Sequence, residues 1–534
     1  MKMPSSTAAV ATDIEPIEVG SFFLETLTTG MYEDPSHCIR EYVQNSYDAI
    51  RDAVRTGVLK EGDGRVLISV GGASRSPSLS IRDNGIGIPA ARAYSTLVSL
   101  GASRKTPAQH AGFRGIGRLA GIAYCTTLRF TTKAKGEDQG TVVEYDCGLI
   151  RGFLKPGADP QDVRKVVRAS VKTRTFQETT DEHYTDVEMA GLTGLGLDFV
   201  QMELLQPYLR QVCPVNYADN FDFADQIRAL AAGYGDTIGV IQVETRQKRE
   251  RISIHKPYKN SAAVGGTKRS STSTLYDIET FTSKEHGWYG WIGKSNFPGE
   301  ITDETVAGVR FRMKNIQIDN SKLIEDIAEE LTASGTDRRL QRWAVGEIFI
   351  VNTEVVPNAR RDGFEDNQAW REIRRDVKEK VARRVVRLIR TASTSRSNLK
   401  RLATTFPQLE GALQVPNLTT SDKAKLEAEV KKQIDTLGSD KLAGVDPKEV
   451  SSLISKYKGL QEKLAGIQAV DPPPTSSPLT SPSEEGDVPS SAQGPVEDPQ
   501  ARDILGVVYE VLAEELGDEE AQRLLELITS RLTE

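Results

Sequence analysis

The chain has 534 residues, of which 38% are hydrophobic and 27% charged, so it is too long for one domain and predicts three to four. Its net charge of −7 excludes a generally basic surface for nucleic acid, although local basic patches remain open. No run of about 18 apolar residues occurs, so we expect no membrane span. The first residues lack an apolar core behind a basic start, and we expect no secretory signal. Four widely separated cysteines and five scattered histidines give no zinc signature and favour a reducing, cytoplasmic location.

Residues 36–56 are predicted to form a helix that begins at Ser36, a favourable N-cap residue. Apolar residues recur along one side of it at helical spacing: Ile39, Val43, Tyr47, Ile50 and Val54. On the other side Glu41, Asn45 and Asp48 are four and three residues apart, which places them on one face. Taken alone, this acid–amide–acid face also fits an ordinary solvated helix.

Two segments, 65–72 and 78–83, alternate like strands, and the second runs into the turn IRDNGIGIP. The strand ends at Asp83, and the glycines Gly85 and Gly87 permit positive φ and a close approach of the backbone. A lone carboxylate at such a turn can accept a hydrogen bond from an exocyclic amine such as that of adenine. A plain Asp-Asn-Gly turn explains the same letters.

The stretch GFRGIGR forms a glycine-rich loop at residues 112–118, flanked by lysine and arginine. Its backbone N–H groups, ahead of an apolar run at 119–125, suit a triphosphate. No strand leads directly into the loop and no Gly-Lys-Ser/Thr follows, so it is neither a dinucleotide fingerprint nor a P-loop. With further strands at 124–133 and 186–192, residues 1–205 are predicted to form an α+β sandwich domain.

The rest of the chain divides into four predicted parts. Residues 206–370 form a second α+β unit, with strand-like segments at 236–245, 287–293, 308–318 and 345–356. Residues 371–470 are helical: a basic helix with twelve Lys/Arg against three Asp/Glu covers 371–401, and a short heptad seam follows Asp446. Residues 471–500, rich in Pro, Ser and acids, predict a disordered linker, and residues 501–534 predict two short amphipathic helices that dock or dimerise.

Together, and in this order, the three patterns resemble the GHKL or Bergerat-fold ATPases, the superfamily of gyrase, heat-shock chaperones, histidine kinases and MutL. About 35 residues separate Asp48 from Asp83 and about 29 separate Asp83 from Gly112, as that resemblance requires. It covers roughly residues 15–395. The resemblance implies a Bergerat-fold ATP-binding domain over 1–205 and an α+β transducer domain over 206–370.

The resemblance also implies roles for individual residues. Glu41 matches the general base, Asn45 the residue that holds Mg²⁺, and Asp83 the reader of adenine. Asp48 matches an acid near the nucleotide. The remaining matched positions are Gly85 and Gly87 at the adenine end and, in the lid over residues 97–118, Lys105 and the phosphate loop with Gly112, Gly115, Ile116 and Gly117.

Two further matches are looser. Thr185 matches the threonine that supports the adenine-reading acid, although Tyr184 replaces the glycine that usually precedes it. In the second domain, the segment 347–365 resembles the transducer loop of the chaperone branch, whose arginine reaches the γ-phosphate. Arg361 is the first choice for that arginine and Arg360 the second, while a solvated Arg-Arg-Asp turn is the alternative.

Glu41 favours an ATPase over a histidine kinase, because kinases of this superfamily lack that acid. The implied function is an ATP-hydrolysing switch of the chaperone or MORC-like kind, similar to bacterial Hsp-type ATP-binding proteins, with ATP and Mg²⁺ bound and a homodimer that can depend on nucleotide. The alternative is a nucleotide-gated module that binds DNA through helix 371–401, or binds a protein, with slow or incidental hydrolysis. An unknown protein partner is expected at the C-terminal helices.

Overall fold

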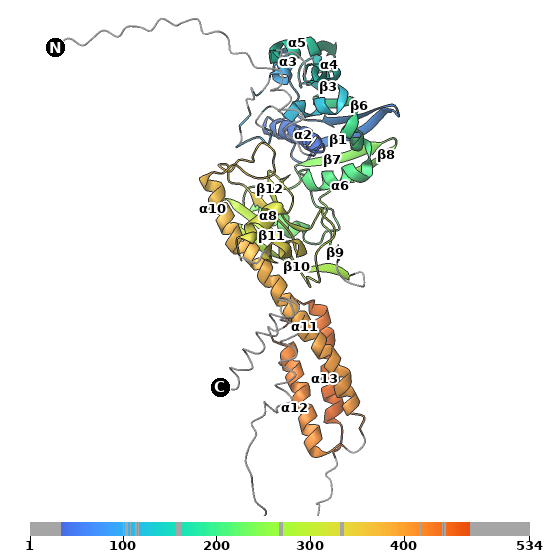
Figure 1. Cartoon of the computed structure of the whole chain (residues 1–534), viewed down its shortest axis with the longest axis vertical. Helices are drawn as coiled ribbons and strands as arrows, with labels where there is room; N and C mark the ends of the chain where they lie inside the picture. The colour runs from blue at the N-terminus through green and yellow to red at the C-terminus, as the bar shows by residue number, and fades with distance from the viewer. Residues whose placement is uncertain are drawn as a thin grey trace, which may run out of the picture. The chain divides into compact units, whose positions relative to one another are not determined.

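The computed structural model describes residues 34–469, apart from 100, 102–104, 107, 113–114, 116, 156–161, 266–270, 332–335, 416–417, 440–441 and 443–444. Two mixed sheets and a set of long helices make up this part of the chain (Figure 1). The expected α+β class is therefore confirmed. The predicted linker 471–500 and the terminal helices 501–534 lie outside the described residues.

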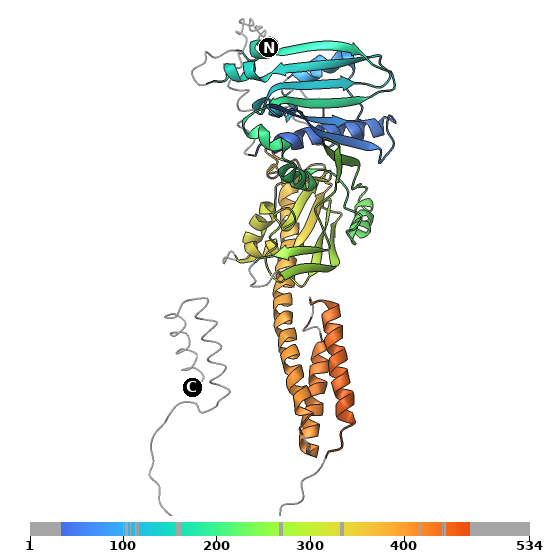
Figure 2. The same ribbon diagram turned by 90° about the vertical axis from the view of Figure 1, so that its right-hand side faces the viewer.

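The first sheet has the strand order β5-β4-β3-β6-β2-β1-β7-β8 in the part of the chain described. Its strands are β1 Gly64–Ala73, β2 Ser76–Asp83, β3 Cys125–Lys133, β4 Gln139–Asp146, β5 Val171–Gln177, β6 Tyr184–Leu192, β7 Ile241–Gln247 and β8 Glu250–Ile254. They lie side by side in Figure 2. All neighbours are antiparallel except β1 and β7, which run parallel.

The two faces of this sheet differ because side chains alternate along each strand. The inner face carries buried apolar residues such as Ile68, Leu79 and Phe130. On the other face, Arg129 pairs with Glu144 and Glu188, and all three side chains are about one-third exposed. The helices and short helical turns of this domain are α2 His37–Arg55, α3 Ala90–Val98, η1 Gly117–Ala123, α4 Cys147–Phe153, α5 Val163–Ser170, η2 Gly194–Val200 and α6 Met202–Val212.

Helix α2 forms where the sequence predicts it, and its apolar stripe enters the core of the first sheet. Ile39, Val43 and Ile50 are at most 1% exposed. Ser36 flanks the helix, but its side chain makes no capping bond; its own N–H donates to Asp34 Oδ1 at 2.8 Å. Burial of the stripe fixes which face of the helix turns toward the polar side.

The expected boundary between residues 205 and 206 does not separate the two sheets, because it falls inside α6. The segment predicted as a second-domain strand at 236–245 becomes β7, and β7 pairs with β1 from Gly64↔Ile241 to Val70↔Gln247. Between α6 and β7, helix α7 Ala224–Ala232 packs into the core of the second sheet. Alternation predicts a strand but not its partner, and here the chain crosses between the two cores more than once.

The second sheet has the order β13-β12-β14-β11-β10-β9. Its strands are β9 Ser261–Val264, β10 Ser271–Ser283, β11 Trp288–Ser295, β12 Gly308–Met313, β13 Ile316–Ile318 and β14 Val345–Ile350, and its short helices are α8 Lys322–Glu329, α9 Thr336–Leu340 and η3 Gln341–Trp343. The single strand expected at 308–318 is a hairpin, with Lys314 and Asn315 at φ +52° and +60° between β12 and β13. Positive φ at both positions matches a two-residue hairpin turn.

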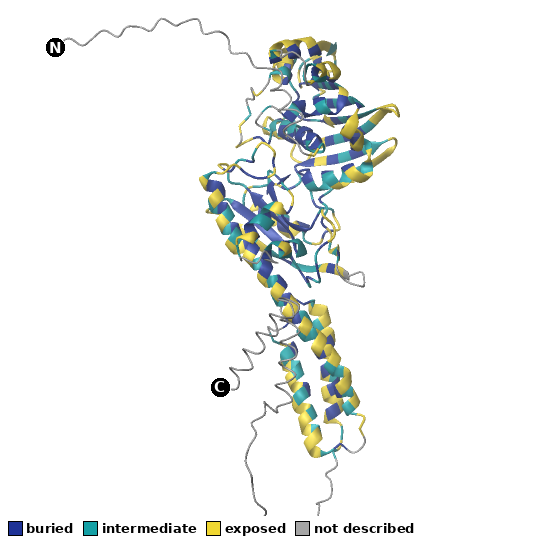
Figure 3. Ribbon diagram, in the orientation of Figure 1, coloured by how far each residue is buried: buried dark blue, intermediate teal, exposed yellow. Residues whose placement is uncertain are grey.

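The region 371–470 is helical, as expected, and its seam packs within the chain. α10 Gln368–Val377, a π-helical turn η4 Lys378–Ala382 and α11 Arg383–Ala412 follow one another, and α12 Thr420–Leu437 and α13 Pro447–Ala465 complete the region. The seam residues Leu453, Tyr457 and Leu464 are buried against residues of α11 and α12, and Tyr457 Oη donates to the Leu402 carbonyl at 2.7 Å. The exposed residues lie along the outer sides of these helices (Figure 3). The seam therefore closes a three-helix bundle rather than presenting a free dimerisation face.

Candidate active site

The polar face of α2 turns into a large pocket that is also lined by the central strands β2, β6 and β3 of the first sheet. Glu41 is 8% exposed and Asp48 1% exposed, so this face is not solvated. The pocket has a volume of about 810 Å³, within the range of small-molecule sites. Predicted site residues line it from several elements: Glu41, Asn45, Asp83, Gly87, Lys105, Gly112, Gly115, Gly117, Thr185 and Arg361.

Asp48 holds the lid against α2. Its two carboxylate oxygens accept the N–H groups of Ala111 at 2.7 Å and Gly112 at 2.9 Å, and Oδ2 also accepts from Lys105 Nζ at 2.8 Å. Burial alone would raise the pKa of Asp48, but the Lys105 ammonium and the two amides lower it. The carboxylate is thus kept ionised in a buried position.

The same lysine marks a place for a cation. Lys105 Nζ lies 3.4 Å from Asn45 Oδ1 as well as 2.8 Å from Asp48 Oδ2, so a positive charge already occupies the space between amide and carboxylate oxygens. Such oxygens suit Mg²⁺, which binds few protein ligands together with phosphate oxygens and water. In the described part of the chain, no group of three or more His, Cys, Asp or Glu could hold a metal.

The glycine loop approaches α2 so closely that a side chain on it would have to displace Glu41 or Asn45. A Cβ built on Gly117 would lie 2.1 Å from Glu41 Oε2, and one on Gly112 would lie 2.8 Å from Asn45 Oδ1. Gly115 lies in the left-handed region at φ +71°. Ile116 lies outside the described residues. The apolar run after the loop forms the 3₁₀ turn η1, and the strand β3 begins at Cys125.

Asp83 ends β2 at the far end of the pocket and is 4% exposed. Its Oδ1 accepts the N–H of Gly85 at 2.8 Å and of Thr185 at 3.3 Å, and the Ser46 hydroxyl bonds the same carboxyl. Burial raises the pKa of Asp83 to about 7 although these three donors lower it. A buried carboxylate that keeps an open lone pair can read an exocyclic amine.

Thr185, Gly85 and Gly87, the other residues expected at the adenine end, lie around Asp83. Thr185 pairs with Asp83 across β2 and β6. A Cβ on Gly85 would lie 2.9 Å from Asp83 Oδ1, and one on Gly87, at φ +67°, would lie 1.9 Å from the Lys133 carbonyl oxygen. Both glycines are therefore required by close packing at this end of the pocket.

Arg361 reaches this site from the second domain. Its Nε lies 3.2 Å from Glu41 Oε1, and its Nη2 donates to the Ala111 carbonyl. Arg361 is 5% exposed and has φ +59°, an uncommon conformation that clusters at functional sites when the surroundings enforce it. Arg360 contributes its carbonyl, which accepts from Arg40 Nη2 at 3.0 Å. The structure thus brings Arg361 to Glu41, and the carbonyl of Arg360 to Arg40 beside it.

Three residues that contact the site are not part of any of the sequence motifs. Ser46 supports Asp83, and His110 anchors the lid by accepting the Thr106 N–H at Nδ1 while its Nε2 lies 3.4 Å from Asp52. Lys314 donates to the His110 carbonyl at 2.8 Å. Asn315, a residue type that tolerates positive φ, is the only local signal of the turn at Lys314.

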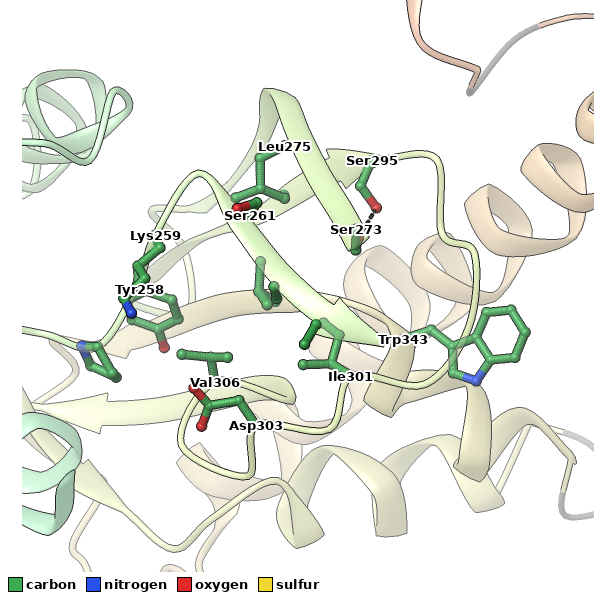
Figure 4. Close-up of a pocket in the computed structure, with 15 residues that line it drawn as sticks. Tyr258, Lys259, Ser261, Ser273, Leu275, Ser295, Ile301, Asp303, Val306 and Trp343 are labelled. Carbon is green, nitrogen blue, oxygen red and sulfur yellow. Dashed lines mark hydrogen bonds between the residues drawn. The ribbon is translucent and has the colours of Figure 1, made fainter. Parts of the chain in front are cut away.

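A second, smaller cavity of about 200 Å³ lies on the second sheet (Figure 4). Its lining is largely apolar, with Lys259 and Asp303 as the charged residues. The Ser273 and Ser295 hydroxyls bond each other at 2.9 Å. The groups needed for phosphate or base recognition converge at the larger pocket instead.

The basic helix at 371–401 carries much of its charge in ion pairs. Arg374 and Lys378 both pair with Glu330, and Arg390 Nη2 lies 2.6 Å from Asp337 Oδ1. The other pairs are Arg371–Asp366, Lys380–Asp376, Arg383–Glu379 and Arg384–Glu279. These acidic neighbours reduce the positive potential that the DNA alternative requires.

A helix carrying an acid and an amide, a carboxylate at the end of the next strand pair and a glycine lid around one pocket define a GHKL-type nucleotide-binding domain. Residues 32–150 match the family described as histidine kinase-, DNA gyrase B-, and HSP90-like ATPases, so this part of the chain is a domain of the GHKL superfamily. Comparison with curated proteins gives no match. None of the described helices is long and apolar enough to cross a membrane.

Proposed function

We propose that the protein is an ATP-binding and ATP-hydrolysing conformational switch. The observation that carries this proposal is the meeting of Glu41, Asn45 and Arg361 at one end of a pocket whose other end is Asp83. Adenine at Asp83 directs the phosphates toward the glycine loop and α2. GHKL domains bind ATP and typically hydrolyse it, which supports the same assignment.

Each residue has a distinct task in this proposal. Glu41 accepts the proton of the attacking water as general base, and Asn45 holds Mg²⁺, which when bound neutralises phosphate oxygens. The backbone N–H groups of the loop over 112–117 and the Arg361 guanidinium stabilise charge that develops on the γ-phosphate. When the nucleotide binds, the Lys105 ammonium leaves Asn45 and Asp48 and contacts the phosphates.

The pairing of Glu41 with Arg361 gives the switch a resting state. While Glu41 Oε1 accepts from the Arg361 guanidinium, that oxygen is not available to a water molecule. Arg361 therefore has to turn from Glu41 to the nucleotide before hydrolysis, which ties the second domain to the reaction. We place the protein with the chaperone or clamp-like ATPases, acting as a homodimer whose closure depends on nucleotide and whose partner binds the C-terminal helices.

Purified full-length protein tests this function through turnover and binding together. Glu41→Gln is expected to lower the rate of ATP hydrolysis by about 10²–10⁴-fold, the contribution of a general base, while calorimetry still detects binding of a non-hydrolysable ATP analogue. The matched control is Glu61→Gln at an exposed position, with unchanged turnover. Undiminished hydrolysis in Glu41→Gln, or no nucleotide binding by the wild type, overturns the proposal.

A further inference from the structure

The turn between β12 and β13 reaches from the second domain to the lid. Lys314 Nζ donates to the His110 carbonyl at 2.8 Å, although 204 residues separate the two in sequence. Arg361, from a different loop of the same domain, donates to the next carbonyl, that of Ala111. Two cations of the second domain thus hold two consecutive lid carbonyls.

The same lid residues are held from the opposite side. The N–H groups of Ala111 and Gly112 donate to the two oxygens of Asp48 on α2. The backbone of residues 110–112 therefore lies between the carboxylate of α2 and the cations of the second domain. Movement of the second domain by more than about 1 Å would break the Lys314 bond, because hydrogen bonds weaken steeply beyond about 3.5 Å.

A buried ionic network makes the turn at Lys314 rigid. Asn315 Nδ2 donates to the Val215 carbonyl at 3.1 Å, and its own carbonyl accepts from Arg312 Nη1 at 3.1 Å. Arg312 also pairs with Glu347 Oε1, which accepts from Lys256 Nζ at 2.8 Å as well, and the side chains of these three residues are fully buried. The position of the Lys314 ammonium is therefore set by the sheet, not by a flexible loop.

We propose that Lys314 is a positioning residue that fastens the lid segment 110–112 to the second domain. It holds the segment in the conformation in which the Ala111 and Gly112 amides donate to Asp48. Lys314 lies outside the lining of the nucleotide pocket, so it acts through the lid rather than on the substrate. This assignment deepens the proposed function and rests on it for its effect on turnover.

Burial of the lysine agrees with a structural bond. Lys314 is partly buried, and burial lowers its pKa to about 8 although Asp48 opposes that change. The neighbouring cations Arg361, Arg51 and Lys105 lower the pKa further.

Hydrogen exchange of the full chain without nucleotide tests the bond independently of catalysis. Lys314→Met is expected to raise exchange of the Ala111 and Gly112 amides about tenfold, the effect of losing a hydrogen bond to a charged group. Lys314→Arg restores most of the protection. The matched control, Lys322→Met at an exposed position of α8, leaves it unchanged.

Steady-state ATPase kinetics of the Lys314 variants are the second measurement. If the lid has to be fastened for hydrolysis, Lys314→Met lowers kcat while the affinity for ADP changes less than about twofold, since no pocket contact is lost. Should Lys314→Met fail to fold, Lys314→Gln tests the same bond with a smaller rise in exchange. Exchange within about twofold of wild type in a folded variant overturns the proposal. Failure of the ATPase proposal appears instead as absent turnover with the lid exchange still dependent on Lys314.

Discussion

Arg361 Nε lies 3.2 Å from Glu41 Oε1, although 320 residues separate them along the chain. The contact joins the carboxylate of Glu41 on α2 to a loop of the second domain in a buried environment. Because Arg361 pairs with Glu41 and lines the pocket, the second domain contributes a residue to the site.

Removal of the Arg361 side chain should therefore affect turnover strongly. Arg361→Ala is expected to lower kcat by about 10²–10³-fold, the typical loss for one preorganised donor to a developing charge. Arg360→Ala serves as the comparison, because the structure uses the Arg360 carbonyl in its bond to Arg40. Steady-state ATPase kinetics on both variants decide which arginine serves the phosphate, and a larger loss in Arg360→Ala would reverse the assignment.

The close approach of Gly117 to Glu41 predicts a steric requirement. Gly117→Ala places a methyl group 2.1 Å from Glu41 Oε2 unless the lid or the carboxylate moves, so turnover should be lost. Gly152→Ala in α4 is the control, because a Cβ there meets nothing within 4 Å and alanine favours a helix. Equal ATPase rates for the two variants would show that the loop does not approach Glu41 in solution.

Nucleotide affinity should depend on pH through Asp83. Burial raises its pKa to about 7, and the ionised form is the one that accepts from an amine without a competing proton. Protonation as pH falls through 7 should weaken ADP binding, by at most about tenfold per pH unit for one proton. Calorimetry across this range measures the slope, and Asp83→Asn should bind weakly with the slope removed. A slope that persists in Asp83→Asn would assign the pH dependence to another group.

The buried network of the second domain predicts a large stability effect. Burial alone would raise the pKa of Glu347, but Arg312 and Lys256 lower it to about 2, so the carboxylate is ionised in the folded protein. Glu347→Gln leaves both cations without a counter-charge and should lower the free energy of unfolding by about 3–5 kcal/mol. Urea denaturation measures the change. The exposed Glu354→Gln is the control, expected to stay within about 0.5 kcal/mol of wild type.

The local part of the fold could be predicted from the sequence because its signals are local. The stripe of α2 and the alternation ending at Asp83 place helix, strand and pocket residues within short windows, and β1, β2, β3 and β6 form at the expected segments. Burial then fixes which face of α2 carries Glu41 and Asn45. The burial of that face itself could not be read from composition, because charged residues on a helix usually face water.

Contacts between segments that are far apart in the sequence could not be predicted. Nothing in the alternation of 236–245 says that β7 lies parallel to β1, since a strand's partner depends on the whole sheet. The contacts of Lys314 and Ser46 are of the same kind: each depends on a partner more than 35 residues away. Arg361 was found only through its resemblance to a loop, and its bond to Glu41 required the fold.

The run of helix from α10 through η4 to α11 spans the second-domain core and the bundle without interruption. From Gln368 to Ala412 it covers about 45 residues, or about 65 Å at 1.5 Å per residue. Val377 lies in the core of the second sheet and Leu409 in the bundle. A rotation of the sheet by about 10° would swing the far end by about 11 Å, from the length of the helix. In the proposed switch, this helix would carry a small rotation of the second sheet to the three-helix bundle as a displacement of several ångströms.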